Sequence, residues 1–210
     1  MTKTNDLTEG KVSRVLLGFF FPMLFTNLLQ QIYTFADSAI VGKGLGDNSL
    51  AAVGNMSALT LLIIGFAQGI TNGFSVIIAQ NFGSKDMSAL RKSIAISIKL
   101  SLILSVILTA ISLIFLKSVL IAMKTDEIII EESLIYGYII FGGLTATMAY
   151  NLCSCILRAL GDSKTPFIAI IISSALNIIL DCLFIFILKT GVGGAAIATI
   201  IAQIVSVIIC

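Results

Sequence analysis

The sequence predicts an all-α, polytopic membrane protein with six transmembrane helices. Its 210 residues are 58% hydrophobic and only 11% charged, with a mean hydropathy of +1.08. A soluble domain of this length needs a more polar surface. The apolar runs are long and lack the alternation of β-barrel strands, which need only about 9–11 residues to cross a bilayer. Only helical membrane spans therefore fit this composition.

The first span is expected over residues 15–39, after a cytoplasmic N-terminal tail of residues 1–14. Lys11 and Arg14 precede the apolar run and resemble the basic start of a signal peptide. However, the run from Val15 to Ala36 is longer than a signal peptide's apolar region and has no clear cleavage site. We therefore interpret it as a retained transmembrane helix.

Polar breaks at 42–48, 82–92, 117–132, 158–165 and 189–194 separate the later segments. Each segment is close to or above the roughly 20 residues that a span needs. The five later spans are expected over residues 50–80, 93–116, 129–156, 166–188 and 193–210. Glycines within and beside these spans are expected to allow close helix contact; they are Gly65, Gly69, Gly73, Gly142, Gly143, Gly193 and Gly194.

The positions of Lys and Arg predict the orientation of the chain. The N-terminus and the second and fourth breaks hold eight of these residues, whereas the other three breaks hold four. Basic residues favour the cytoplasmic side. We therefore expect a multi-pass protein of the cell membrane with both termini cytoplasmic. The last segment ends at Cys210 without a polar flank, which favours a chain that is part of a longer protein.

Several functional classes are disfavoured by composition. The chain has no His, and its cysteines (Cys153, Cys155, Cys182 and Cys210) all lie in apolar segments without zinc-site spacing. We therefore predict that it is not an enzyme and holds no cofactor. A net charge of +2 with scattered basic residues gives no reason to expect a nucleic-acid partner.

Asp37 and Asp181 are the acidic residues that lie inside predicted spans. A carboxylate in hydrocarbon is costly and usually serves a function. From the helical rise, Asp37 lies about 9 Å and Asp181 about 12 Å below the outer surface. Thr199 and Tyr136 are expected in the same layer. Four helices therefore place polar groups in one pocket in the outer half of the membrane.

Residues one turn away support a shared cation site. Asn177 precedes Asp181, and Tyr33 precedes Asp37, each by four positions on one helical face. The amide of Asn177 can supply an oxygen to a hard cation such as Na⁺, or a donor to an ionised carboxylate. Two acids in a low-dielectric pocket are not expected to ionise together, which suits a site that carries H⁺ or binds Na⁺ instead. The alternative is that these polar groups only cap or cross-link helices.

Two further features concern gating and the transport path. Pro22 lies inside the first span, where it removes a backbone hydrogen bond and permits a bend. It lies about four turns before Asp37, so cation binding could bias a bent against a straight helix; a static packing kink is the alternative. Gln68 and Asn72 share one face of the second span and could line a water-filled path.

A series of motifs, in order, resembles the multidrug and toxic compound extrusion (MATE) family of antiporters. They cover nearly the whole chain. The stretches are Pro22, Gln30–Asp37, Val41-Gly42, Leu50–Gly54, Ile78–Gln80 with Gly83, Arg158–Pro166, Asn177 with Asp181, and Gly191–Thr199.

This resemblance implies a twelve-helix fold of two six-helix lobes that exports drug-like organic cations in exchange for H⁺ or Na⁺. The chain matches the N-terminal lobe, and the second lobe is absent. The family's N-lobe cation ligands match Asp37, Asn177, Asp181 and Thr199, and residues around that pocket match Tyr33, Tyr136 and Asn151. The implied partners are the lipid bilayer, amphiphilic cationic small molecules and a second six-helix lobe.

Other transport mechanisms fit less well. An ATP-driven exporter would carry a G-x-x-x-x-G-K-[ST] loop, which the sequence lacks. The sequence also has neither the paired Asn-Pro-Ala loops of a water channel nor the Arg-rich helix of a voltage sensor. A lipid-linked oligosaccharide flippase of the same wider superfamily is the nearest alternative, and an inactive truncated fragment is another.

Overall fold

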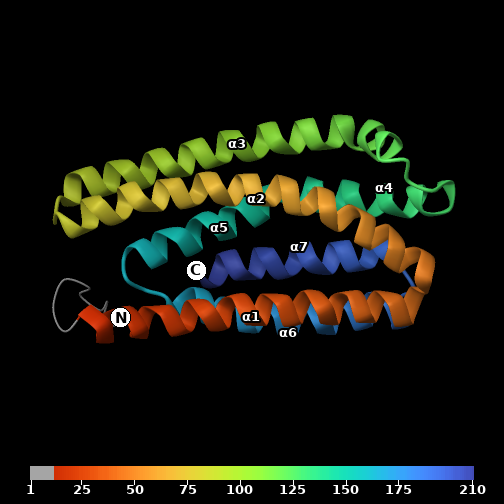
Figure 1. Ribbon diagram of the computed structural model, residues 1–210, viewed down its shortest axis with the longest axis horizontal. Helices are drawn as coiled ribbons and strands as arrows, with labels where there is room; N and C mark the ends of the chain where they lie inside the picture. The colour runs from red at the N-terminus through yellow and green to blue at the C-terminus, as the bar shows by residue number, and fades with distance from the viewer. Residues whose placement is uncertain (1–11) are drawn as a thin grey trace.

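The computed structural model describes residues 12–210, without the side chains of residues 12–16, 18 and 19. The expected tail, residues 1–14, therefore lies almost wholly outside the described residues. Helices make up the described secondary structure (Figure 1). They are α1 (Val12–Leu45), α2 (Asp47–Gly83), α3 (Met87–Ala122), α4 (Glu127–Gly142), α5 (Leu144–Ala159), α6 (Lys164–Cys182), the π-helical turn η1 (Leu183–Ile187) and α7 (Val192–Ile209).

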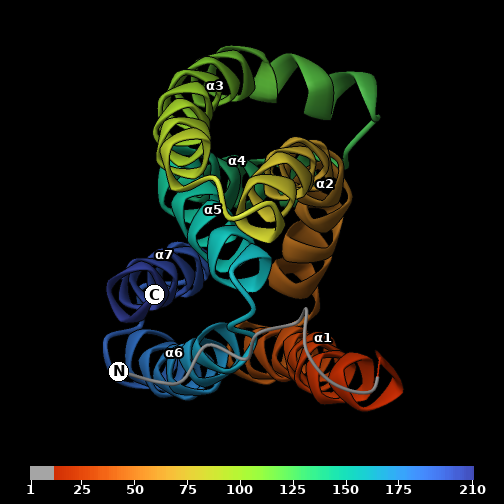
Figure 2. The ribbon, with the colours of Figure 1, turned by 90° about the vertical axis from the view of Figure 1, so that its left-hand side faces the viewer.

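The helices run along one long axis, and the chain reverses at the two ends of the bundle. The α2–α3 and α5–α6 turns lie at the end where the described chain begins (Figure 1). The α1–α2, α3–α4 and η1–α7 turns lie at the opposite end. In the end-on view α1 and α6 lie side by side, and α6 also packs against α7 (Figure 2). The breaks that are rich in basic residues therefore share one end of the bundle.

Length and composition identify four helices that can cross a membrane. They are α2, α3, α6 continued by η1, and α7; the bent pair α4 and α5 makes a fifth if it counts as one span. The sequence predicted six. This count covers only the described residues, and the apolar first half of α1 includes residues whose side chains are not described, so the first predicted span is not tested by it. As a helix, α1 is nevertheless continuous over 34 residues.

Most helices extend further than the sequence predicted. For example, α3 covers Met87–Ala122 instead of residues 93–116, and α6 begins at Lys164. A helix of 36 residues is about 54 Å long and therefore exceeds the hydrocarbon core. Polar residues at its ends stay helical, and some of them cap it: Asp86 accepts hydrogen bonds from the backbone N–H groups of Ser88 and Ala89. The polar breaks were thus predicted too wide.

Residues 129–156 do not form one straight helix as predicted. The axis bends by 47° between α4 and α5, at the Gly142-Gly143 pair. A Cβ on Gly143 would lie 2.6 Å from Cγ1 of Ile200 on α7, whereas one on Gly142 would meet nothing within 4 Å. The bend therefore coincides with a close approach to Ile200 of α7, which would have to shift to admit a side chain at residue 143.

The predicted role of glycine in helix contact is right at some positions and wrong at others. Gly193 approaches Ile135 and Ile139, and Gly194 approaches Thr190 and Phe184. In contrast, a Cβ on Gly65, Gly69 or Gly73 would meet nothing within 4 Å in the described part of the chain. These three glycines of α2 follow one another at intervals of four residues, so they form an open strip on a single face.

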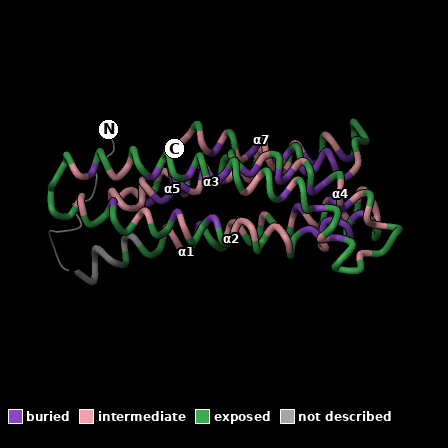
Figure 3. Tube along the Cα trace, turned by 90° about the horizontal axis from the view of Figure 1, so that it is seen from above, coloured by how far each residue is buried: buried purple, intermediate pink, exposed green. Residues whose placement is uncertain are grey.

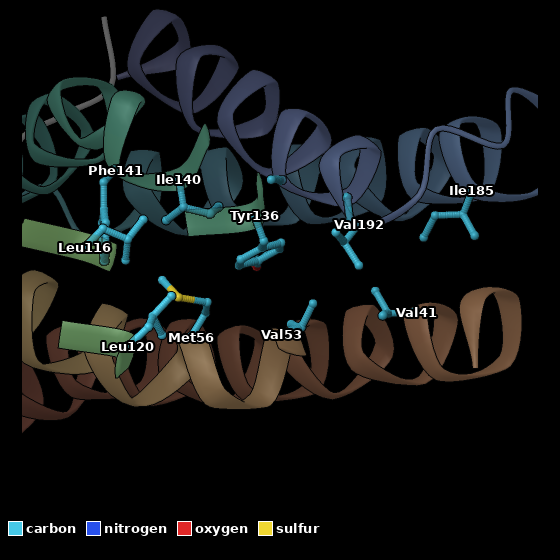
Figure 4. Close-up of a cluster of buried hydrophobic side chains, with 12 residues drawn as sticks. Val41, Val53, Met56, Leu116, Leu120, Tyr136, Ile140, Phe141, Ile185 and Val192 are labelled. Carbon is cyan, nitrogen blue, oxygen red and sulfur yellow. The ribbon is translucent and has the colours of Figure 1, made fainter. Parts of the chain in front are cut away.

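Buried and exposed positions alternate along the helices, as the colours along the Cα trace in Figure 3 show. The largest buried cluster joins α1, α2, α3, α4, η1 and α7. In Figure 4, Tyr136 lies within this cluster with Met56, Val53 and Val192 around it. Many large apolar side chains are exposed, among them Leu61 at 77% and Ile114 at 71%. Such surfaces suit contact with lipid.

Candidate functional site

The structure brings the predicted cation-site residues together between α1, α6 and α7. Asp37 on α1 is 7% exposed, and Asn177 and Asp181 on α6 are fully buried. Helix α6 packs against both α1 and α7, so it places its polar pair next to Asp37 and next to Thr199. The four-residue spacing on α6 gives Asn177 and Asp181 the same face. The convergence expected from their depths is present.

Asn177 links Asp181 to Thr199. In the amide orientation that satisfies both of its ends, Nδ2 donates to Oδ2 of Asp181 at 2.8 Å. Oδ1 then accepts a hydrogen bond from the backbone N–H of Thr199 at 3.2 Å. Asn177 thus acts as a donor to the carboxyl group, one of the two roles that its spacing allowed. Its oxygen is already used and would have to turn before it could bind Na⁺.

Both carboxyl groups keep an unsatisfied oxygen. Among the described residues, Oδ1 of Asp37 and Oδ1 of Asp181 are buried and have no hydrogen-bond partner. The two carboxyl groups lie close enough to interact electrostatically with each other, and both act on Tyr33 and Tyr136. A buried, unpaired charged oxygen is costly, so this arrangement fits a site that takes up a proton or a small cation.

The other predicted pocket residues, Gln68 and Asn151, lie elsewhere. They line a separate cavity of about 760 Å³ between α1, α2 and α5, and Asn72 lines it as well. Here Sγ of Cys155 donates to Oδ1 of Asn72 at 3.2 Å, and Nη2 of Arg158 donates to Sγ of Cys155 at 3.4 Å. Arg158 was not among the site residues predicted from the sequence, and its position one turn after Cys155 and two turns after Asn151 was the available signal.

A much smaller cavity, of about 30 Å³, lies between these two sites. Gln30, Tyr33 and Tyr150 all line this small cavity. Gln30 and Tyr150 also line the large cavity, and Tyr33 lies next to the two carboxyl groups. Its remaining wall is largely polar and includes Ser173 and Gln203. Polar residues therefore connect the two sites through the interior of the lobe.

Pro22 lies within the continuous helix α1. Its carbonyl oxygen accepts a hydrogen bond from Oγ1 of Thr26 at 2.7 Å. No group of three or more Cys, Asp or Glu side chains that could hold a metal ion occurs in the part of the chain that the structure describes. The four cysteines are free.

The fold and the buried carboxyl pair define a helical membrane protein with a polar site in its interior. The family model MatE matches residues 22–183, and the chain belongs to the MATE family. It is 34% identical over 201 residues to the probable multidrug resistance protein YpnP of Bacillus subtilis (strain 168), with 96% of this chain and 45% of that protein covered.

Solved MATE structures have the same fold. A crystal structure in the bent conformation matches with a TM-score of 0.92 and 32% identity, covering all of this chain and 46% of that one. A structure in the straight conformation matches with a TM-score of 0.90 and 33% identity, covering 99% of this chain and 46% of that one. The chain spans about half the length of the curated relatives it matches.

Proposed function

We propose that the chain is one lobe of a secondary active multidrug exporter of the cell membrane. In this proposal amphiphilic organic cations or other drugs leave in exchange for H⁺ or Na⁺. The coupling cation binds at Asp37, Asn177, Asp181 and Thr199, and a second six-helix lobe completes the drug path. The observation that carries the proposal is the pair of buried carboxyl groups, each with an unpaired oxygen, on neighbouring membrane helices.

The mechanism follows from where the two acids lie. Asp37 is on α1, whereas its partners Asp181 and Thr199 are on α6 and α7. Without a cation, two negative charges in a low-dielectric pocket repel each other and push α1 away from α6. A bound proton or Na⁺ removes that repulsion and draws the helices together. Pro22 lowers the cost of bending α1, so uptake of the cation is coupled to the shape of this helix.

The role of Asn177 favours H⁺ over Na⁺ in this proposal. Its Nδ2 donates to Asp181 and its Oδ1 accepts from the backbone of Thr199. The amide donor thereby stabilises negative charge on the carboxyl pair, and Asp37 and Asp181 can hold one proton between them. Binding of Na⁺ requires several oxygen ligands, and the amide would have to turn and lose both of its hydrogen bonds.

A chimera tests the proposal. Residues 1–210 replace the matching half of the Bacillus relative, and ethidium efflux is measured in cells. We expect Asp37→Asn and Asp181→Asn each to abolish efflux, and Pro22→Ala to slow it and alter its pH dependence. Asp47→Asn is the control, because Asp47 is exposed in the first turn of α2, away from the pocket. Full efflux by both pocket variants would refute the coupling role.

Chemical labelling of the carboxyl groups tests the cation site even if the chimera does not transport ethidium. A carbodiimide reacts with protonated carboxyl groups in apolar surroundings, and the modified residue is found by mass spectrometry of the 210-residue chain. Modification is expected at Asp37 or Asp181.

Efflux that stops when Na⁺ is removed at constant pH would select Na⁺ as the coupling ion instead of H⁺.

A further inference from the structure

The large cavity between α1, α2 and α5 is separate from the carboxyl cluster and has no role in the proposed coupling. Its volume, about 760 Å³, is that of a site for a drug-sized molecule. Helix α1 contributes Met23–Gln30 to it, and Asp37 lies about two turns further along. The cavity therefore occupies the half of the lobe towards the α2–α3 and α5–α6 turns (Figure 1).

The wall of this cavity is polar, and its charge is positive. Among its described lining residues Arg158 is the one charged side chain, and none is acidic. Six amide side chains also line the cavity and can donate or accept hydrogen bonds; they are Asn27, Gln30, Gln68, Asn72, Gln80 and Asn151. The one aromatic side chain that lines the cavity is Tyr150.

Two donors in the cavity are not well satisfied by the protein. Arg158 is half-buried, and its Nη2 donates to the sulfur of Cys155 at 3.4 Å, which is a weak acceptor. Nδ2 of Asn151 is buried and has no hydrogen-bond partner among the described residues. Arg158 follows Asn151 by seven positions, so the two lie on one face of α5 about two turns apart and both line the cavity. A planar guanidinium matches a carboxylate or a phosphate, and the free amide donor can bind another part of the same molecule.

We propose that this cavity binds a small organic anion, with its carboxylate or phosphate group on Arg158 and its hydrogen-bonding body on the surrounding amides. An organic cation is not suited to this wall, because its described residues offer no carboxylate and only one aromatic face. Cationic drugs must then bind elsewhere along the path. The proposal concerns binding and stands whether or not the carboxyl cluster couples transport.

An ordinary topological role for Arg158 is the competing explanation. Basic residues are enriched at the cytoplasmic ends of membrane helices whether or not they bind a ligand. Arg91 is also near a turn at this end of the bundle, but it is exposed and does not line the cavity. Arg91→Gln therefore removes the same charge without changing the cavity, which makes it the matched control for Arg158→Gln.

Cys155 allows the charge preference of the cavity to be measured directly. Cys153, Cys182 and Cys210 are replaced by Ala in the full chain, so that Cys155, which lines the cavity, is the remaining thiol. The chain is treated with anionic 2-sulfonatoethyl methanethiosulfonate or cationic 2-(trimethylammonium)ethyl methanethiosulfonate. Each rate is divided by the rate of the same reagent with free cysteine. The ratio of the two corrected rates cancels changes in thiol reactivity.

We expect the corrected rate to be about tenfold higher for the anionic reagent, as one charge at short range predicts. Arg158→Gln should remove this preference, Arg158→Lys should keep it because the charge remains, and Arg91→Gln should leave it unchanged. Equal rates in the parent chain, a preference that survives Arg158→Gln, or no reaction with either reagent would each overturn the proposal.

Competition then tests binding and identifies the anionic group. Citrate supplies carboxylates and AMP supplies a phosphate, and adenosine is the uncharged counterpart of AMP. Slower modification of Cys155 with citrate, with AMP or with both supports the site and tells the two groups apart. Protection by adenosine equal to that by AMP, or no protection by either anion, contradicts it.

Discussion

At the scale of single residues, Asn177 determines how the carboxyl cluster is organised. It is fully buried, and both ends of its amide have partners on neighbouring groups. The sequence predicted that Asn177 and Asp181 share a face, because a spacing of four residues is enough for that. It left open whether the amide donates or accepts, because this depends on the backbone N–H of Thr199 on another helix.

A charged residue outside the membrane spans gives a pH-dependent prediction. Asp162 accepts hydrogen bonds from the backbone N–H groups of Lys164 and Thr165 and from the Thr165 hydroxyl, and so caps the start of α6. Burial raises the pKa of Asp162, but these hydrogen bonds outweigh burial and hold the pKa below its usual range. The ionised carboxylate therefore stabilises the fold above pH of about 4, and this contribution is lost as the pH falls through the lowered pKa.

Asp162→Asn should lower the melting temperature at pH 6, and the difference from the wild type should shrink below pH of about 4. Asparagine still offers an oxygen to the helix, so the change removes mainly the charge. The control is Asp47→Asn, because Asp47 is exposed in the first turn of α2. A difference that stays constant from pH 6 to pH 3 would show that ionisation of Asp162 does not stabilise α6.

At the scale of helices, the Gly142-Gly143 pair shows where sequence reasoning stops. The sequence predicted the polar breaks between spans and the glycine enrichment. It did not predict the 47° bend, because both glycines look equivalent locally. The difference between them comes from Ile200, which is 57 residues later and packs against only one of the two. The π-helical turn after Asp181 was not predicted either, because residues 166–188 form one continuous apolar stretch in the sequence.

The two neighbouring glycines provide a matched test of this packing. Gly143→Ala would force its methyl group into the side chain of Ile200, whereas Gly142→Ala would meet open space. We expect Gly143→Ala to destabilise the fold by about 1–3 kcal/mol, the usual cost of overpacking. Gly142→Ala should be neutral or slightly stabilising, because alanine favours a helix more than glycine does. Unfolding in detergent measures both, and equal effects would contradict the close approach at Gly143.

At the scale of the whole molecule, the chain contains every residue of the proposed cation site. Helices α1, α6 and α7 supply these residues and pack against one another. The large cavity and the glycine strip of α2 differ from the cation site, because contacts between the described residues leave them open. The described walls of the large cavity come from α1, α2 and α5, and the glycine strip of α2 meets nothing among the described residues. The curated relatives are about twice as long as this chain.

Cation binding and drug export should therefore separate in the 210-residue chain. We expect carbodiimide to modify Asp37 or Asp181 when residues 1–210 are produced alone, because the cluster depends only on contacts within the lobe. Ethidium efflux should be absent from the same cells and should appear only in the chimera with a second lobe. The double variant Asp37→Asn, Asp181→Asn controls for labelling elsewhere. Efflux by the isolated chain at the rate of the chimera would show that one lobe suffices. Loss of labelling in the isolated chain would show instead that the second lobe is needed to form the cation site.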